Sequence, residues 1–172
     1  MIHIGLLSDT HGYFDQRLPE IFHSCNEIWH AGDIGTLEVA QKLAALKPLR
    51  AVYGNIDGSL IREQFPQHQI FTCGKLKIWM THIGGYPPRY TATIKKQLDD
   101  IQPDVFICGH SHILRVIPDK QRNLLHLNPG AAGQEGFHSV RTLLRFAINP
   151  EQTGISAIVQ LQVIELGKRG QI

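Results

Sequence analysis

IHIGLLSDTH, residues 2–11, begins as a largely apolar run and ends in four polar residues, Ser8 to His11. The apolar segment Ile2–Leu7 predicts a buried β-strand. Asp9 and His11 follow it directly, and residues two apart in an extended chain project to the same side, so both can face one point. This stretch predicts an α/β fold in which ligand-binding side chains gather where a strand ends.

Further short apolar or alternating runs, each bounded by Gly, Asp, Asn or Pro, recur along the chain. Predicted strands span Ile2–Leu7, Glu27–His30, Leu49–Tyr53, Gln69–Thr72, Lys77–Thr81, Val105–Cys108, Leu114–Ile117, Leu124–Leu127, Thr142–Ile148 and Ser156–Ile164. Predicted helices span Phe14–Ser24, Thr36–Leu46 and Thr91–Ile101. Strands that alternate with helices indicate parallel α/β units. Because the last third is mostly strand, we expect a second, largely antiparallel sheet to pack on the first.

Length and composition indicate a single domain over residues 1–172, since 42% hydrophobic and 19% charged residues are ordinary for a globular chain. The net charge of +2 comes from scattered basic residues, so nucleic acid is an unexpected partner. Three cysteines without C-x-x-C spacing fit a reducing compartment. No signal segment or apolar run of ~20 residues is visible. We expect a cytoplasmic protein with no membrane partner, and a homo-oligomer stays open.

Five short polar clusters each follow a predicted strand. They are Asp9-Thr-His11, Gly32-Asp33, Gly54-Asn55-Ile56-Asp57, Thr81-His82 and Gly109-His110-Ser111-His112. In an open α/β sheet the loops that leave the carboxyl ends of the strands converge and bind ligands there. We therefore expect the five clusters to meet at one sheet edge.

Seven side chains in these clusters carry metal-binding atoms: Asp9, His11, Asp33, Asn55, His82, His110 and His112. This mixed oxygen and nitrogen set, without a thiolate, suits Mn²⁺, Zn²⁺ or Fe and is too rich in nitrogen for Ca²⁺. Seven donors exceed what one tetrahedral ion can use, whereas two ions that share a bridging carboxylate would use them all. The set predicts two divalent metal ions.

The clusters resemble the motifs of the calcineurin-like metallophosphoesterases, which read D-x-H, G-D, G-N-H-(D/E), a lone His and G-H-x-H. The size of the chain and its Asn128-Pro129-Gly130 segment look most like the small YfcE-type phosphodiesterases. The resemblance implies two facing mixed β-sheets flanked by helices, a four-layer α/β/β/α sandwich. It assigns Asp9, His11 and His112 to one metal, Asn55, His82 and His110 to the other, and Asp33 as the bridge.

The activity that this resemblance implies is hydrolysis of small phosphate esters, most of all phosphodiesters, by a hydroxide that bridges the two metals. Asn55 would touch the phosphate, and Asp57 would orient a neighbouring ligand. Asn128, Gly130 and His138 are further candidates for substrate binding. Mn²⁺ is the first expectation for the metal, with Zn²⁺, Fe, Ni²⁺ and Mg²⁺ as alternatives.

One position departs from the family motif, since Ile56 stands where the full motif has a histidine that protonates the leaving group. General-acid catalysis typically contributes a factor of ~10²–10⁴. Without that donor, basic leaving groups should suffer most, so we expect a preference for diesters or activated esters over ordinary monoesters. His138 is one candidate for a donor from elsewhere.

Other functions remain as alternatives. The superfamily includes a retromer subunit of this fold that serves in protein trafficking, so the alternative is a non-catalytic, metal-binding protein-interaction scaffold. The complete set of seven donors favours the enzyme. A nuclease is less expected, because the near-neutral charge offers no track for a polyanion backbone.

Overall fold

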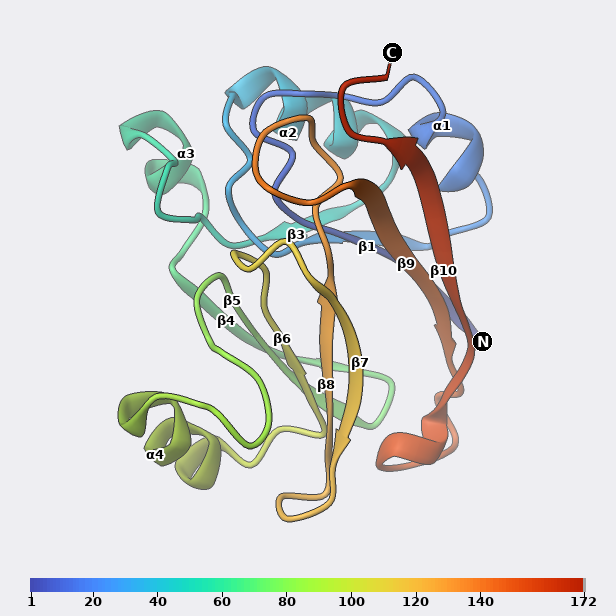
Figure 1. Cartoon of the computed structure of the whole chain (residues 1–172). Helices are drawn as coiled ribbons and strands as arrows, with labels where there is room; N and C mark the ends of the chain where they lie inside the picture. The colour runs from blue at the N-terminus through green and yellow to red at the C-terminus, as the bar shows by residue number, and fades with distance from the viewer. Residues whose placement is uncertain (172) are drawn as a thin grey trace.

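Two five-stranded sheets face each other in the computed structural model, which describes residues 1–171 (Figure 1). The first sheet has the order β10-β9-β1-β2-β3 and the second β4-β5-β6-β8-β7. The strands of the first sheet are β1 (Ile2–Leu7), β2 (Glu27–His30), β3 (Leu49–Ala51), β9 (Val140–Ile148) and β10 (Ile158–Lys168). Those of the second are β4 (His68–Cys73), β5 (Leu76–Thr81), β6 (Val105–Ile107), β7 (Leu114–Asp119) and β8 (Leu124–Pro129).

Helices cover the outer faces of both sheets. They are α1 (Leu18–Ile21), α2 (Leu37–Leu46), α3 (Ser59–Gln64) and α4 (Ala92–Ile101), with a short 3₁₀ turn at Ile155–Ala157. Side chains of α1, α2 and α3 pack with the outer face of the first sheet, and those of α4 pack with the second. A third apolar cluster fills the space between the sheets. These layers confirm the predicted sandwich of facing sheets flanked by helices. None of the helices described is both long and apolar enough to span a bilayer.

The expectation of a second, largely antiparallel sheet in the last third of the chain is wrong in its details. Strands β9 and β10 join the first sheet, where β9 pairs antiparallel with β1. The second sheet is mixed, because β5, β6 and β8 run parallel while β4 and β7 are antiparallel edges. Strand β9 is buried along almost its whole length, on both faces, which requires a place inside a sheet with layers on either side.

Two predicted helices are present, and the third is much shorter than expected. The hydroxyls of Thr36 and Thr91 accept backbone hydrogen bonds from residues three positions on, so α2 and α4 begin where predicted. The predicted helix Phe14–Ser24 is reduced to one turn, α1. The Asp15 carboxylate binds the backbone N–H and guanidinium of Arg17, which makes a turn of the segment that should have begun the helix. The six-residue α3 was not predicted, since it is too short to show a period.

Candidate metal centre

The seven predicted donor residues follow the carboxyl ends of five parallel strands. Asp9 and His11 follow β1, Asp33 follows β2 and Asn55 follows β3. The other three come from the second sheet: His82 follows β5, while His110 and His112 follow β6. The clusters therefore meet where the edges of two facing sheets come together, rather than at the edge of one sheet as the sequence predicted.

The backbone at the site is in an unusual conformation. Eight residues other than glycine have positive φ in the part of the chain described, and five of them are donors: Asp9, His11, Asp33, His110 and His112, with φ between 47° and 69°. Non-glycine residues adopt this left-handed conformation at a cost, and such residues concentrate at functional sites. Five of the seven donors therefore lie in left-handed turns that follow the ends of strands.

Six of the donor side chains form two groups, within each of which the candidate ligand atoms lie no more than 4.8 Å apart. One group is Asp9, His11 and His112, and the other is Asp33, His82 and His110. The groups adjoin, because His11 Nε2 lies 3.8 Å from Asp9 Oδ1 and 3.6 Å from Asp33 Oδ2. His82 Nε2 likewise lies 3.8 Å from Asp9 Oδ1 and 3.2 Å from Asp33 Oδ2.

Hydrogen bonds determine which nitrogen carries the proton in three imidazoles, those of His82, His138 and His112. Nδ1 of His82 lies 2.7 Å from the Ala31 carbonyl oxygen, which can only accept, so Nδ1–H donates and Nε2 keeps its lone pair. His138 and His112 form a series of hydrogen bonds that begins at the Gly133 carbonyl, which accepts from His138 Nε2–H at 3.0 Å. Nδ1 of His138 then accepts from His112 Nδ1–H at 3.1 Å, which leaves the His112 Nε2 lone pair 3.2 Å from Asp9 Oδ1.

The Asp9 carboxylate is ionised in this setting. Burial acts to raise its pKa, but the imidazoles of His11, His112 and His82 and the Ser8 hydroxyl, which surround the carboxylate, hold the pKa well below its usual range. The Ser8 hydroxyl donates to Asp9 Oδ2 at 2.6 Å, and the backbone N–H of His110 donates to the same oxygen at 3.1 Å. Both contacts leave Oδ1 directed at the imidazoles.

Several buried acceptors at the centre have no hydrogen-bond partner: Asp9 Oδ1, His11 Nε2 and His82 Nε2. Lone pairs and carboxylate oxygens that face one another in a buried site repel and have lost their water, which is costly unless a cation lies among them. The donors are imidazole nitrogens and carboxylate oxygens, a set suited to first-row divalent ions. The residues present therefore fit divalent metal ions.

Asp57 lies behind the donors and holds two loops together. Its carboxylate accepts from the backbone N–H groups of Ile34 and Gly35, after β2, and of Gly54, after β3. It contacts backbone amides rather than a donor side chain, so it supports Asp33 and Asn55 through the loops that carry them.

Besides Asn55, the three further candidates for substrate binding, Asn128, Gly130 and His138, also have supporting contacts. The Asn128 amide, which is buried, donates to the Gly109 carbonyl and the Ser111 hydroxyl, and its oxygen accepts from the Gly130 N–H. His138 binds His112 and Gly133, as described above. None of the three is among the residues that line the cavities beside the donors.

Two cavities flank the donor groups, and Asn55 lines both of them. The first, of about 220 Å³, we call the Arg62 cavity; its lining includes Tyr53, Asn55, Arg62, Gln67, His68 and His82. The second, of about 240 Å³, we call the Phe137 cavity; its lining includes His11, Asn55, Ile56, His110, His112 and Phe137. Arg62 and Phe137 belong to no motif, so the sequence contained no signal for them.

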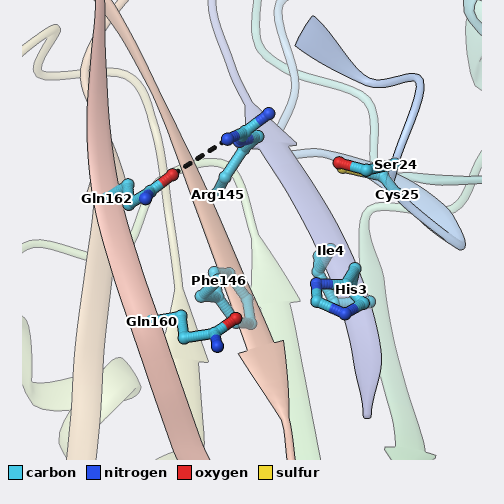
Figure 2. A pocket seen from close by; sticks show the side chains of 8 residues that line it. All are labelled: His3, Ile4, Ser24, Cys25, Arg145, Phe146, Gln160 and Gln162. Carbon is cyan, nitrogen blue, oxygen red and sulfur yellow. Dashed lines mark hydrogen bonds between the residues drawn. The ribbon is translucent and has the colours of Figure 1, made fainter.

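A larger cavity, of about 450 Å³, lies elsewhere in the molecule (Figure 2). His3 and Ile4, near the amino end of β1, line one side of it. Figure 2 shows Arg145 hydrogen-bonded to Gln162 on the other side, at 2.9 Å. This cavity contains none of the seven donors, so it is not the candidate catalytic site.

Comparison with known proteins agrees with this geometry. The calcineurin-like phosphoesterase superfamily domain matches residues 2–151. A probable metallophosphoesterase from Methanothermobacter thermautotrophicus is 30% identical over 137 residues, which cover 74% of this chain and 76% of the relative.

Solved structures share the fold. A novel archaeal phosphodiesterase matches with a TM-score of 0.70 and 23% identity, covering 96% of this chain and 100% of that one. Vps29 from Entamoeba histolytica, complexed with Zn²⁺, matches with a TM-score of 0.72 and 17% identity, covering 95% and 99%.

Proposed function

Because the chain belongs to the calcineurin-like phosphoesterase superfamily, we propose that it is a phosphodiesterase that uses two divalent metal ions to hydrolyse small phosphate esters. One observation carries the proposal: two adjoining groups of imidazole and carboxylate donors, of which Asp9, Asp33 and His82 are buried, face one another with unpaired acceptor atoms. Divalent ions held among these donors would offset the repulsion between them and would supply the Lewis acidity that ester hydrolysis needs.

We assign the donors to metals as the two groups lie. Asp9, His11 and His112 would hold one ion, and His82 and His110 would hold the other. Asn55, which lines the cavities on both sides of the donors, would join the second set. Asp33 would contribute to both sites, which is supported by the position of its Oδ2 between His11 and His82. Mn²⁺ remains the first expectation, with Zn²⁺, Fe, Ni²⁺ and Mg²⁺ as alternatives, and the four imidazoles favour the first-row ions over Mg²⁺.

Bound divalent ions supply Lewis acidity, which ionises water to hydroxide near neutral pH and neutralises charge on the phosphoryl oxygens. The protein itself positions the atoms that would bind the ions. The hydrogen bonds to Ala31 and His138 present Nε2 of His82 and His112 to the centre. Asn55, which is exposed and lines both cavities, would contact a phosphoryl oxygen of the substrate.

The leaving group receives no proton from position 56. The Ile56 backbone N–H donates to Asp33 Oδ1 at 3.0 Å, while its apolar side chain is 47% exposed and lines the Phe137 cavity. His138 does not replace the missing donor in our proposal, because both its ring nitrogens are engaged. Esters with acidic leaving groups are therefore the preferred substrates.

The test combines metal content with turnover. Protein stripped of metal should hydrolyse bis(p-nitrophenyl) phosphate only after a single kind of divalent ion is added back, with two ions bound per chain. The scaffold alternative predicts that ions bind but that no ester in a panel of mono- and diesters turns over. The exchange Asp33→Asn serves as the inactive control.

A further inference from the structure

The two cavities beside the donor groups differ in chemistry, and this difference indicates which kind of substrate the site would bind. Resting on the proposed function, we propose that the substrate is an asymmetric phosphodiester with one anionic arm in the Arg62 cavity and one apolar, aromatic arm in the Phe137 cavity. Asn55 lines both cavities, so a phosphate held at the donors can extend one ester arm into each.

Arg62 is a fixed cation without a counter-ion. Its Nε donates to the Asp57 carbonyl at 2.6 Å, and its guanidinium lies 4.5 Å from the centre of the Tyr53 ring. Nη2 makes longer contacts with the carbonyls of Gly54 and Asn55, at 3.5 and 3.4 Å. All these partners are neutral, and within residues 1–171 no carboxylate lies within 4.0 Å of the guanidinium nitrogens.

These contacts hold the guanidinium at the cavity wall without using Nη1. A preorganised guanidinium with spare donors binds carboxylate or phosphate oxygens strongly. His68 and Gln67, which also line the cavity, add polar groups but no negative charge. The Arg62 cavity is therefore suited to an ester arm that carries a carboxylate or a second phosphate.

The Phe137 cavity has the opposite character. The Phe137 side chain is fully exposed, and Ile56 lines the same cavity. The backbone on either side of Phe137 is anchored: Gly136 packs so closely on the His112 ring that an added Cβ would lie 2.2 Å from Nδ1, and the His138 ring binds His112.

An aromatic ring on an anchored loop, exposed beside a catalytic centre, has no role in packing the fold. Burying it against a ligand ring removes apolar surface from water, and paired rings gain further from edge or offset contact. The Phe137 cavity is therefore suited to a phenyl or similar arm.

Water is the only co-substrate that hydrolysis of such a diester consumes. The water oxygen forms a new bond to phosphorus, the bond from phosphorus to one ester oxygen breaks, and that oxygen takes up a proton. The products are an alcohol or phenol and a phosphate monoester.

Three p-nitrophenyl diesters with one common leaving group test the anionic arm. Their second arms are 2-carboxyethyl, propyl and 2-(trimethylammonio)ethyl. We expect kcat/KM to be about tenfold higher for the carboxyethyl than for the propyl ester, and lowest for the cationic ester. Arg62→Gln should remove this order and Arg62→Lys should keep part of it. Arg50→Gln is the matched control, because Arg50 also lies over an aromatic ring, at Phe71, but is paired with Glu27.

Binding provides a second readout. Calorimetric titration of the metal-loaded protein with 2-carboxyethyl phosphate should show affinity about tenfold weaker in Arg62→Gln than in wild type. For the aromatic arm, Phe137→Ala should raise KM for all three esters about tenfold, and Phe137→Leu should raise it less. Ile70→Ala, which removes an exposed apolar side chain from β4, is the control.

The outcomes separate the two proposals. If the loaded wild-type protein hydrolyses no ester, the proposed function fails. If it hydrolyses the series with equal kcat/KM, or if Arg62→Gln slows all three esters alike and leaves their order intact, the substrate assignment fails while the activity stands.

Discussion

At the scale of single residues, the site depends on side chains whose hydrogen bonds leave one atom free. His82, His112 and Asp9 each use some of their polar atoms within the protein and direct the remaining one to the centre. Replacing a supporting partner should therefore weaken metal binding without removing a ligand.

His138→Ala tests this idea at the most distant partner. The exchange removes the acceptor of the His112 Nδ1 proton, so the ring can rotate or adopt its other tautomer. We expect divalent-ion affinity, measured by calorimetry, to fall about 10- to 100-fold. The ¹⁵N chemical shifts of His112 should show a mixture of tautomers. Alanine at the exposed His23 is the control, and unchanged shifts with unchanged affinity in His138→Ala would contradict the assignment.

Ile56→His tests the missing proton donor. A histidine here faces the Phe137 cavity, where it can protonate a departing oxygen. We expect kcat/KM for alkyl esters to rise at least tenfold, while p-nitrophenyl esters, which need no proton, change little. Ile56→Gln controls for polarity alone. Equal gains for both classes of ester would argue against a role in protonation.

At the scale of elements, the segment between β8 and β9 forms a brace over the donors. The N–H groups of Ala132 and Gly133 donate to the carbonyls of Ser8 and Asp9, and Gly136 lies against His112. This segment therefore fixes the turn after β1 and the turn after β6 at once.

Gly136→Ala should have a larger effect on metal binding than on the free energy of unfolding. Gly136 has φ of +119°, and its Cβ would lie 2.2 Å from His112 Nδ1. Gly154 also has positive φ, +64°, but open space around it, so Gly154→Ala is the matched control. Both exchanges should lower the free energy of unfolding by about 1 kcal/mol. Only Gly136→Ala should weaken metal binding about tenfold or more, and equal affinities would overturn the prediction.

The buried strand β8 makes stability depend on pH. Burial, aided by Arg115 and opposed by Asp119, lowers the pKa of His126 to about 4. Unfolding restores a value near 6.5, so between pH 6.5 and 4 the unfolded chain binds a proton that the folded chain does not. The contribution of His126 to the free energy of unfolding is fully present above about pH 6.5. It is lost as the pH falls toward 4, by up to about 3 kcal/mol.

Urea unfolding between pH 4.5 and 8 measures this effect. His126→Phe should reduce the loss of stability below pH 6.5, since a phenyl ring fits beside Tyr90 and Phe106 and does not titrate. The buried His30, whose pKa burial also lowers to about 4, should account for part of the remaining slope. Identical slopes in wild type and variant would show that His126 does not titrate on unfolding.

At the scale of the whole molecule, the centre joins the two sheets. Asp9 and Asp33 belong to the first sheet and His82, His110 and His112 to the second, so a bound ion ties the layers together. Metal binding should therefore stabilise the entire fold and not merely order a loop.

Removal of metal tests this link. A chelator should lower Tm, and added ion at about 100 times its Kd should restore roughly 2.7 kcal/mol of stability. Scanning calorimetry follows the change, with metal content measured in parallel. Asp33→Ala should show a smaller response. A Tm that does not change although two ions leave each chain would mean that the sheets hold together without them.

Sequence by itself determined which residue types follow which strands, because the apolar runs and the Asp, Asn and His clusters are local patterns. It also determined where α2 and α4 begin, because the hydroxyls of Thr36 and Thr91 accept hydrogen bonds from backbone N–H groups three residues further along the chain. It did not determine the sheet that β9 and β10 join, since pairing with β1 is a contact between distant parts of the chain.

Only the tertiary structure decided the rest of the site. Arg62 and Phe137 look like ordinary surface residues in the sequence, and become wall residues because a helix and a loop from opposite halves of the chain flank the same donors. The structure also places His138 behind His112, with the two Nδ1 atoms hydrogen-bonded. The sequence had instead predicted that His138 contacts the substrate. Donor chemistry is a property of each side chain, whereas cavities and proton positions arise from contacts between segments that no local pattern records.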